Sequence, residues 1–123
     1  MGQTIMVVDD SAIIRMQLTT VLEKNGYEAV QASTGIEALE LAKERSDIRL
    51  VITDVNMPGM NGLNLLSELR GMSNYAKVPV FVLTTESTAH MQEQGRDRGA
   101  SAWIVKPFHE ESLIKGIEMM LGN

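Results

Sequence analysis

Apolar runs alternate along the chain with segments in which apolar residues recur at helical spacing. Runs of this kind predict strands, and those that are almost entirely apolar are typical of strands covered on both faces. The predicted strands cover about 4–8, 28–32, 48–53, 79–83 and 101–105.

The segments between the runs predict helices. The first carries an apolar face from Ile14 to Leu22 and is closed by Asn25-Gly26, a typical helix end. Thr34-Gly35-Ile36-Glu37 resembles a capping box at the start of the second helix. Two more apolar faces predict a helix from about 63 to Gly71 and another over 110–121.

The segment 88–98 is the weakest of the helix predictions. It has few apolar residues, and Gly95 lowers its helix propensity further, so we expect a helix mainly because strands flank it. The whole pattern is then (βα)5, which predicts the α/β class with a doubly wound parallel sheet and helices on both faces. We expect a single domain over residues 1–123, because this length suits one core.

Polar residues stand where the apolar runs end. Asp9 and Asp10 follow the first run, Asp54 the third, Thr84 the fourth and Lys106 the fifth. Open parallel sheets place their ligands at the carboxyl ends of the strands. Three carboxylates, a hydroxyl and an ammonium group at one edge predict a divalent-metal and phosphoryl site.

The chemistry of these groups supports that prediction. Adjacent carboxylates repel each other, and burial without a partner is costly, whereas a hard cation relieves both penalties. Mg²⁺ prefers oxygen ligands, retains waters and is commonly shared with a phosphate. Asp54 can also act as a covalent phosphoryl acceptor. Lys106 would place a positive charge on the transferred group, and the Thr84 hydroxyl would donate to a phosphoryl oxygen.

Each of these residues also has a plainer interpretation. Asp9-Asp10 alone suits a solvated turn or the N-cap of a helix. Lys106 alone suits a surface lysine. Thr84 alone suits the cap of a turn, with Thr85 and Ser87 as equal candidates. Their joint position at matching strand ends favours the metal and phosphoryl site.

Composition narrows the classes of function. The formal net charge of −5 and the lack of a Lys/Arg cluster argue against nucleic acid as a partner. The chain has no cysteine, which excludes disulfides, thiolate metal sites and cysteine nucleophiles. Its apolar stretches are too short to span a bilayer, and its start does not fit a signal peptide. We therefore expect a cytoplasmic protein with no membrane partner.

Four motifs in order along the chain resemble the receiver domain of two-component response regulators. They are Val7-Val8-Asp9-Asp10-Ser11, the segment from Thr53 to Gly62, Leu83-Thr84-Thr85-Glu86 and Val105-Lys106-Pro107-Phe108. The resemblance covers the whole chain and is greatest to the single-domain chemotaxis regulators of that family. It implies a flavodoxin-like fold with sheet order 2-1-3-4-5.

The resemblance also implies roles for the strand-end residues. Asp54 would take a phosphoryl group from a phosphohistidine on a sensor histidine kinase. Asp9, Asp10 and the main-chain carbonyl of Asn56 would arrange Mg²⁺. We expect Asp10 and Asp54 to bind the ion directly and Asp9 to act mainly through water. We also expect a cis peptide at Lys106-Pro107.

The remaining implied residues concern signalling. Thr84 and Trp103 occupy the positions of the family's switch pair, where Trp103 departs from the usual Tyr or Phe and its larger ring would restrict inward movement. Asn56 and Glu86 match the positions that flank the phosphoryl group in chemotaxis regulators, which favours a short-lived group accessible to a phosphatase. We expect the output to be a phosphorylation-dependent surface for a downstream protein, such as a flagellar motor switch. That surface would combine segments 88–98, 101–105 and 110–121.

Other hypotheses fit parts of the pattern. A phosphohydrolase of the haloacid dehalogenase type would want an acidic residue two positions after its nucleophile, where this chain has Asn56. A flavodoxin-like FMN carrier would place a phosphate where Asp9-Asp10 repel it. A receiver that shuttles phosphoryl groups in a phosphorelay also stays open. We favour a phosphorylation-controlled binding module over an enzyme.

Overall fold

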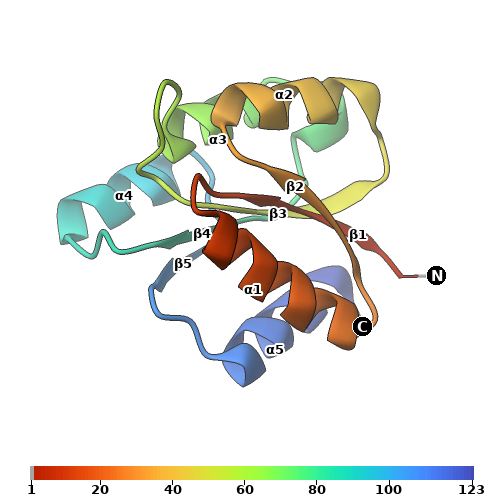
Figure 1. The fold of residues 1–123 in the computed structure, drawn as a ribbon. Coiled ribbons are helices and arrows are strands. Elements are labelled where there is room, and N and C mark those ends of the chain that lie inside the picture. The colour runs from red at the N-terminus through yellow and green to blue at the C-terminus, as the bar shows by residue number, and fades with distance from the viewer. Residues whose placement is uncertain (1) are drawn as a thin grey trace.

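The protein is described here by a computed structural model that covers residues 2–123. Its parallel strands form one sheet in the order β2-β1-β3-β4-β5 (Figure 1), so the predicted α/β class and strand order are confirmed. The strands are β1 (Thr4–Val8), β2 (Glu28–Ala32), β3 (Ile48–Thr53), β4 (Val80–Thr84) and β5 (Ala102–Val105). The helices are α1 (Ala12–Lys24), α2 (Gly35–Glu44), α3 (Gly62–Arg70), α4 (Ala89–Asp97) and α5 (Glu110–Leu121), with the short 3-10 helix η1 (Ser73–Tyr75) before β4.

Two predicted strands differ from the observed ones by one residue. Strand β4 begins at Val80 instead of residue 79 and includes Thr84, which pairs with Val105 of β5. Pro79 has no N–H to donate, although its carbonyl still accepts a hydrogen bond from the Val51 N–H. Strand β5 begins at Ala102 instead of residue 101. Neither difference moves a strand end at the carboxyl edge by more than this one residue.

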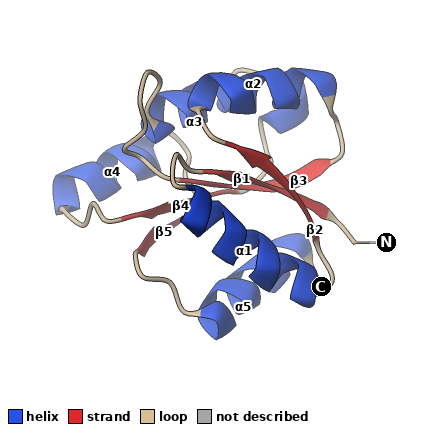
Figure 2. Ribbon diagram, in the orientation of Figure 1, coloured by secondary structure: helices blue, strands red, loops and turns tan. Residues whose placement is uncertain are grey.

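Helices cover both faces of the sheet (Figure 2). Helices α1 and α5 lie on one face, and α2, α3 and α4 lie on the other. Side chains of β1 alternate between the two layers: Ile5 and Val7 join the core under α1 and α5, whereas Met6 and Val8 join the core under α2 and α3. This double burial explains why the central strands are nearly continuous apolar runs in the sequence.

Side-chain caps fix where the helices begin. The Ser11 hydroxyl accepts from the Ile14 N–H at the start of α1, and the Asn61 side chain accepts from the Asn64 N–H at the start of α3. Thr34 caps α2, but the Glu37 carboxylate accepts from the Ser33 N–H one residue before the cap. The capping box is therefore present in a shifted form. Helix α1 starts at Ala12, shortly after β1 ends at Val8, whereas a longer loop separates the end of β3 at Thr53 from the start of α3 at Gly62.

Helix α4 forms as predicted despite its polar sequence and its glycine. Gly95 is buried, and a Cβ atom added to it would lie 2.7 Å from a ring carbon of Trp103 on β5. This contact gives the glycine a packing role, because any larger residue would displace the ring. Among residues 2–123, no helix is both long and apolar enough to cross a membrane.

Candidate active site

The carboxyl edge of the sheet brings the predicted polar residues together. Asp9 and Asp54 are the first residues after β1 and β3 and are buried, whereas Asp10 is exposed. Thr84 is the buried last residue of β4, and Lys106 directly follows β5. Because β1, β3 and β4 are neighbours in the sheet, these groups lie at the point where ligands bind in open α/β sheets.

The three aspartates form an acidic cluster with the geometry of a cation site. Asp9, Asp10 and Asp54 each offer a carboxylate oxygen, and these oxygens all lie within 4.8 Å of one another. Like charges this close destabilise each other unless a cation neutralises them. Mg²⁺ fits this set, because it binds one or two carboxylates and completes its shell with water and phosphate oxygens.

Lys106 reaches across the strand ends to two of these carboxylates. Its Nζ atom lies 2.9 Å from Asp9 Oδ2 and 2.9 Å from Asp54 Oδ2. Burial lowers the pKa of Lys106, but the hydrogen bonds to Asp54 and Asp9 outweigh it, so the pKa lies above its ordinary value. Lys106 therefore stays positively charged at neutral pH. The peptide bond between Lys106 and Pro107 is cis, as predicted.

The carboxylate of Asp54 is held on both of its oxygens. Oδ1 accepts from the Val55 N–H at 2.6 Å and from the Asn56 N–H at 3.4 Å, while Oδ2 accepts from Lys106. Gly62 stands against its main chain, where a Cβ atom would lie only 1.9 Å from the Asp54 carbonyl oxygen. The motif from Thr53 to Gly62 includes this glycine, but only the fold shows that α3 begins directly against Asp54.

The residues expected to signal are connected by hydrogen bonds. The Asn56 side chain donates to Glu86 Oε1 at 3.2 Å, and the Glu86 N–H donates to Thr84 Oγ1 at 3.3 Å. The Trp103 indole N–H donates to the Glu86 main-chain carbonyl at 2.8 Å. Glu86 thus links the position beside Asp54 to the strand-end threonine and to the β5 edge.

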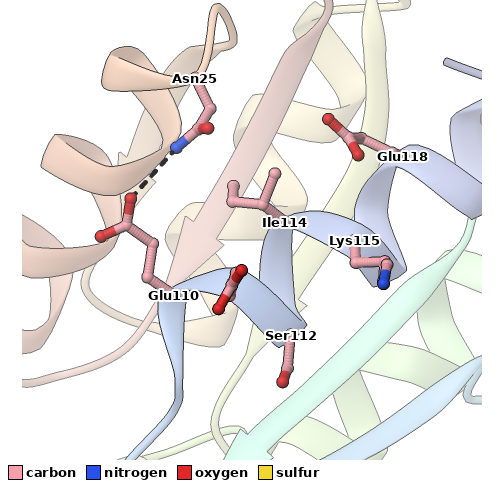
Figure 3. Close-up of a pocket in the computed structure, with 7 residues that line it drawn as sticks. Asn25, Glu110, Ser112, Ile114, Lys115 and Glu118 are labelled. Atoms are coloured by element: carbon pink, nitrogen blue, oxygen red, sulfur yellow. Dashed lines mark hydrogen bonds between the residues drawn. The ribbon is translucent and has the colours of Figure 1, made fainter.

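Two of the hollows among residues 2–123 are the larger ones outside the acidic cluster. One, of about 680 Å³, is a mainly apolar hollow between α1 and the loop before α5, and Lys106 is part of its lining. The other, also about 680 Å³, lies along α5 and is lined by polar and acidic side chains, with Asn25 donating to Glu110 (Figure 3). The second hollow contains none of the predicted site residues.

Comparison with known proteins places this chain in a family. The fold and its carboxyl edge define a doubly wound α/β protein with an acidic cluster beside a lysine. The family model for the response regulator receiver domain matches residues 5–118, so the chain belongs to this family of signalling proteins. The family match leaves the haloacid dehalogenase and FMN-carrier hypotheses without support.

Individual relatives agree with the family assignment. Chemotaxis protein CheY1 of Helicobacter pylori is 37% identical over 120 residues, which are 97% of each chain. The structure of chemotaxis protein CheY4 of Vibrio cholerae matches with a TM-score of 0.92 and 36% identity, over 98% of this chain and 99% of that one. The receiver domain of the sensor histidine kinase PA1611 of Pseudomonas aeruginosa shares the fold with a TM-score of 0.91 and 24% identity, over 100% of each chain, and has a magnesium ion coordinated in its active-site cleft.

Proposed function

We propose that residues 1–123 act as one receiver unit that accepts a phosphoryl group on Asp54 from the phosphohistidine of a sensor kinase. The observation that carries this proposal is the contact of Lys106 Nζ with Asp54 Oδ2 inside a cluster of three carboxylates. An Asp54 carboxylate oxygen attacks phosphorus, an acyl phosphate forms, and the N–P bond of the donor breaks. The electron pair of that bond returns to the donor imidazole.

The residues of the chain divide the work of this transfer. Asp10 and Asp54 would hold Mg²⁺, with Asp9 acting through water, and the ion would supply positive charge to neutralise the phosphoryl oxygens. Lys106 turns from Asp54 Oδ2 towards a phosphoryl oxygen and supplies a second positive charge. The Val55 and Asn56 amides keep the Asp54 carboxylate in position throughout. Positioning and charge neutralisation supply most of the catalysis in reactions of this type.

A direct test uses a small phosphodonor, so that no kinase needs to be known. Incubation with Mg²⁺ and acetyl phosphate should add one phosphoryl group to the intact protein, as measured by mass spectrometry. Asp54→Asn should abolish the gain. Asp47→Asn is the matched control, because Asp47 is an exposed aspartate paired with Arg45, and this variant should react like the wild type. Equal modification of the Asp54 variant would move the acceptor elsewhere.

The metal assignment has its own test. Asp10→Asn should weaken Mg²⁺ binding, measured by calorimetry, and should slow the reaction with acetyl phosphate. Asp10 is exposed, so its replacement should leave the fold intact, and thermal melting without Mg²⁺ checks that point. Unchanged binding and rate would remove Asp10 from the metal site.

The output of phosphorylation would be read on the face of α4, β5 and α5. Phosphoryl oxygens would recruit the Thr84 hydroxyl, whose bond with the Glu86 N–H connects it to the carbonyl that Trp103 contacts. The similarity to two chemotaxis proteins supports a chemotaxis partner, such as a flagellar motor switch, over a phosphorelay. The Asn56–Glu86 contact beside Asp54 leaves a polar rim that suits access by a phosphatase. Binding of a motor-switch peptide with and without beryllium fluoride, a phosphoryl mimic, tests the partner.

A further inference from the structure

Arg15 contacts the acidic edge from the first turns of α1. Its Nη1 atom donates to the main-chain carbonyl of Asp9 at 2.6 Å, and its Nε donates to Gln31 Oε1 on β2 at 3.2 Å. The side chain is half-buried, and the two bonds are made by different nitrogens of one planar guanidinium. Gln31 therefore fixes the orientation in which the guanidinium meets the Asp9 carbonyl.

With Arg15 in place, every polar group of Asp9 has a partner. The N–H donates to the Ala32 carbonyl, and the side-chain oxygens accept from the Ser11 N–H and from Lys106. The remaining polar group is the main-chain carbonyl of Asp9, which belongs to the peptide group that joins Asp9 to Asp10. The Asp10 carboxylate is exposed, so the Asp9–Asp10 turn is what sets its position beside the carboxylates of Asp9 and Asp54.

We propose that Arg15 is a positioning residue for the metal site: its bond to the Asp9 carbonyl holds the Asp9–Asp10 turn in the arrangement that receives Mg²⁺. This inference rests on the proposed function, in which the acidic cluster binds the ion. Partners that orient metal ligands from outside the ligand set typically change metal affinity strongly when they are removed.

The charge of Arg15 allows positioning to be separated from electrostatics. A cation close to the cluster repels Mg²⁺, so loss of its charge alone would strengthen Mg²⁺ binding. Loss of its hydrogen bonds would loosen the turn and weaken binding. These two effects on Mg²⁺ affinity have opposite signs. If Arg15 only connected α1 to the sheet, its replacement would change the stability of the protein and leave the Mg²⁺ affinity of the folded protein unchanged.

The experiment compares Arg15→Gln, Arg15→Lys and Gln31→Leu with the wild type by calorimetric titration with Mg²⁺ alone. Arg15→Gln should weaken binding about tenfold, the lower end of the range for such partners. Arg15→Lys keeps the charge but loses the tie to Gln31, so it should fall between Arg15→Gln and the wild type. Gln31→Leu leaves the charge and Asp9 untouched and should weaken binding by a smaller factor. Arg45→Gln is the control for net charge, since Arg45 pairs with Asp47 outside the site.

A second readout needs no metal. In EDTA, amide hydrogen exchange in the turn at residues 9–11 should be faster in Arg15→Gln than in Arg45→Gln, while the interior of β3 exchanges equally slowly in both. The proposal is overturned if the Arg15→Gln variant binds Mg²⁺ as tightly as the Arg45→Gln variant does, or more tightly. If Arg15→Gln does not fold, Gln31→Leu decides the question by the same two measurements. A wild type that binds no Mg²⁺ and gains no mass with acetyl phosphate overturns the proposed function itself, and this inference with it.

Discussion

The centre of the sheet and its β5 edge are packed in different ways. In β1 every residue is buried, and in β3 only Arg49 is exposed. In β5 the first three residues are half-buried and Val105 is 43% exposed, while the neighbouring α4 buries only Gly95 completely. The residues proposed to hold the metal and the phosphoryl group extend from the centre, and Trp103 belongs to the edge.

This difference matches what the proposed function requires of each region. Phosphoryl transfer requires carboxylates held in fixed geometry, which strands covered on both faces provide. A signalling surface requires an element that can change its arrangement at low cost, and few buried apolar contacts give low local stability. Glu86 and Lys106 join the regions, because Glu86 contacts both Asn56 and Trp103, and Lys106 extends from the end of β5 to Asp9 and Asp54.

The largest expected effect tests this contrast with one residue type in one core. Ile52 of β3 and Ile104 of β5 both belong to the core under α1 and α5, but Ile52 is fully buried and Ile104 is half-buried. Ile52→Ala should lower the free energy of unfolding by about 2–5 kcal/mol. Ile104→Ala should cost about 1 kcal/mol. Urea denaturation measures both, and equal losses would mean that the edge is packed as firmly as the centre.

The sequence predicts the centre of this molecule better than its edge. Burial on both faces makes β1 and β3 nearly continuous apolar runs in the sequence. The polar residue that follows each run marks the carboxyl edge, so the acidic cluster and Lys106 can be predicted from the pattern. The roles of Arg15 and Gly95 cannot be predicted from this pattern, because each depends on a contact with another element. Gly95 lowered the expectation of a helix in the sequence, although in the structure it makes room for Trp103. Pro79 lacks an N–H and lies just before the first residue of β4, a difference that the apolar pattern does not show.

The second prediction concerns the two glycines inside helices α4 and α5. Gly116→Ala should stabilise the protein by about 0.5–1 kcal/mol, since its Cβ would meet the Phe81 ring at an ordinary 3.6 Å. Gly95→Ala should destabilise it despite the same gain in helix propensity, because the ring of Trp103 must move away from the new Cβ. The same movement should weaken the indole bond to Glu86 and change the Trp103 fluorescence. Thermal melting and fluorescence of both variants provide the comparison. Equal stabilisation of both would show that the Trp103 ring moves away from the new Cβ atom without loss of stability.

The third prediction concerns coupling between the regions. Trp103 is the only tryptophan, and its fluorescence should change when Mg²⁺ and beryllium fluoride are added. Thr84→Ala should keep the mass gain with acetyl phosphate but remove this fluorescence change, because the Thr84 hydroxyl is the proposed link to the phosphoryl oxygens. Ser87→Ala is the control, as a nearby hydroxyl in the same loop. A signal that persists in Thr84→Ala would show that the edge responds by another route.

The smallest expected effect is the loss of stability at alkaline pH when Lys106 is deprotonated. The ion pairs of Lys106 with Asp9 and Asp54 connect the end of β5 to the centre of the sheet. Its pKa is raised in the folded protein, so its stabilising contribution is complete below the ordinary lysine value of 10.5 and is lost as pH rises through the higher folded-state pKa. Burial also raises the pKa of Tyr75 above its ordinary value of 10.0, which produces a loss of stability with the same sign. The measurement therefore uses Tyr75→Phe as the background, in EDTA, with urea midpoints between about pH 9 and 11.5, a window that spans both ordinary values. In this background the free energy of unfolding should fall at the upper end of the pH window. Adding Lys106→Met should make this fall shallower. It should also lower the free energy of unfolding near neutral pH, because two buried carboxylates lose their partner. An equally steep fall in both proteins would show that the tie between edge and centre does not depend on the Lys106 charge.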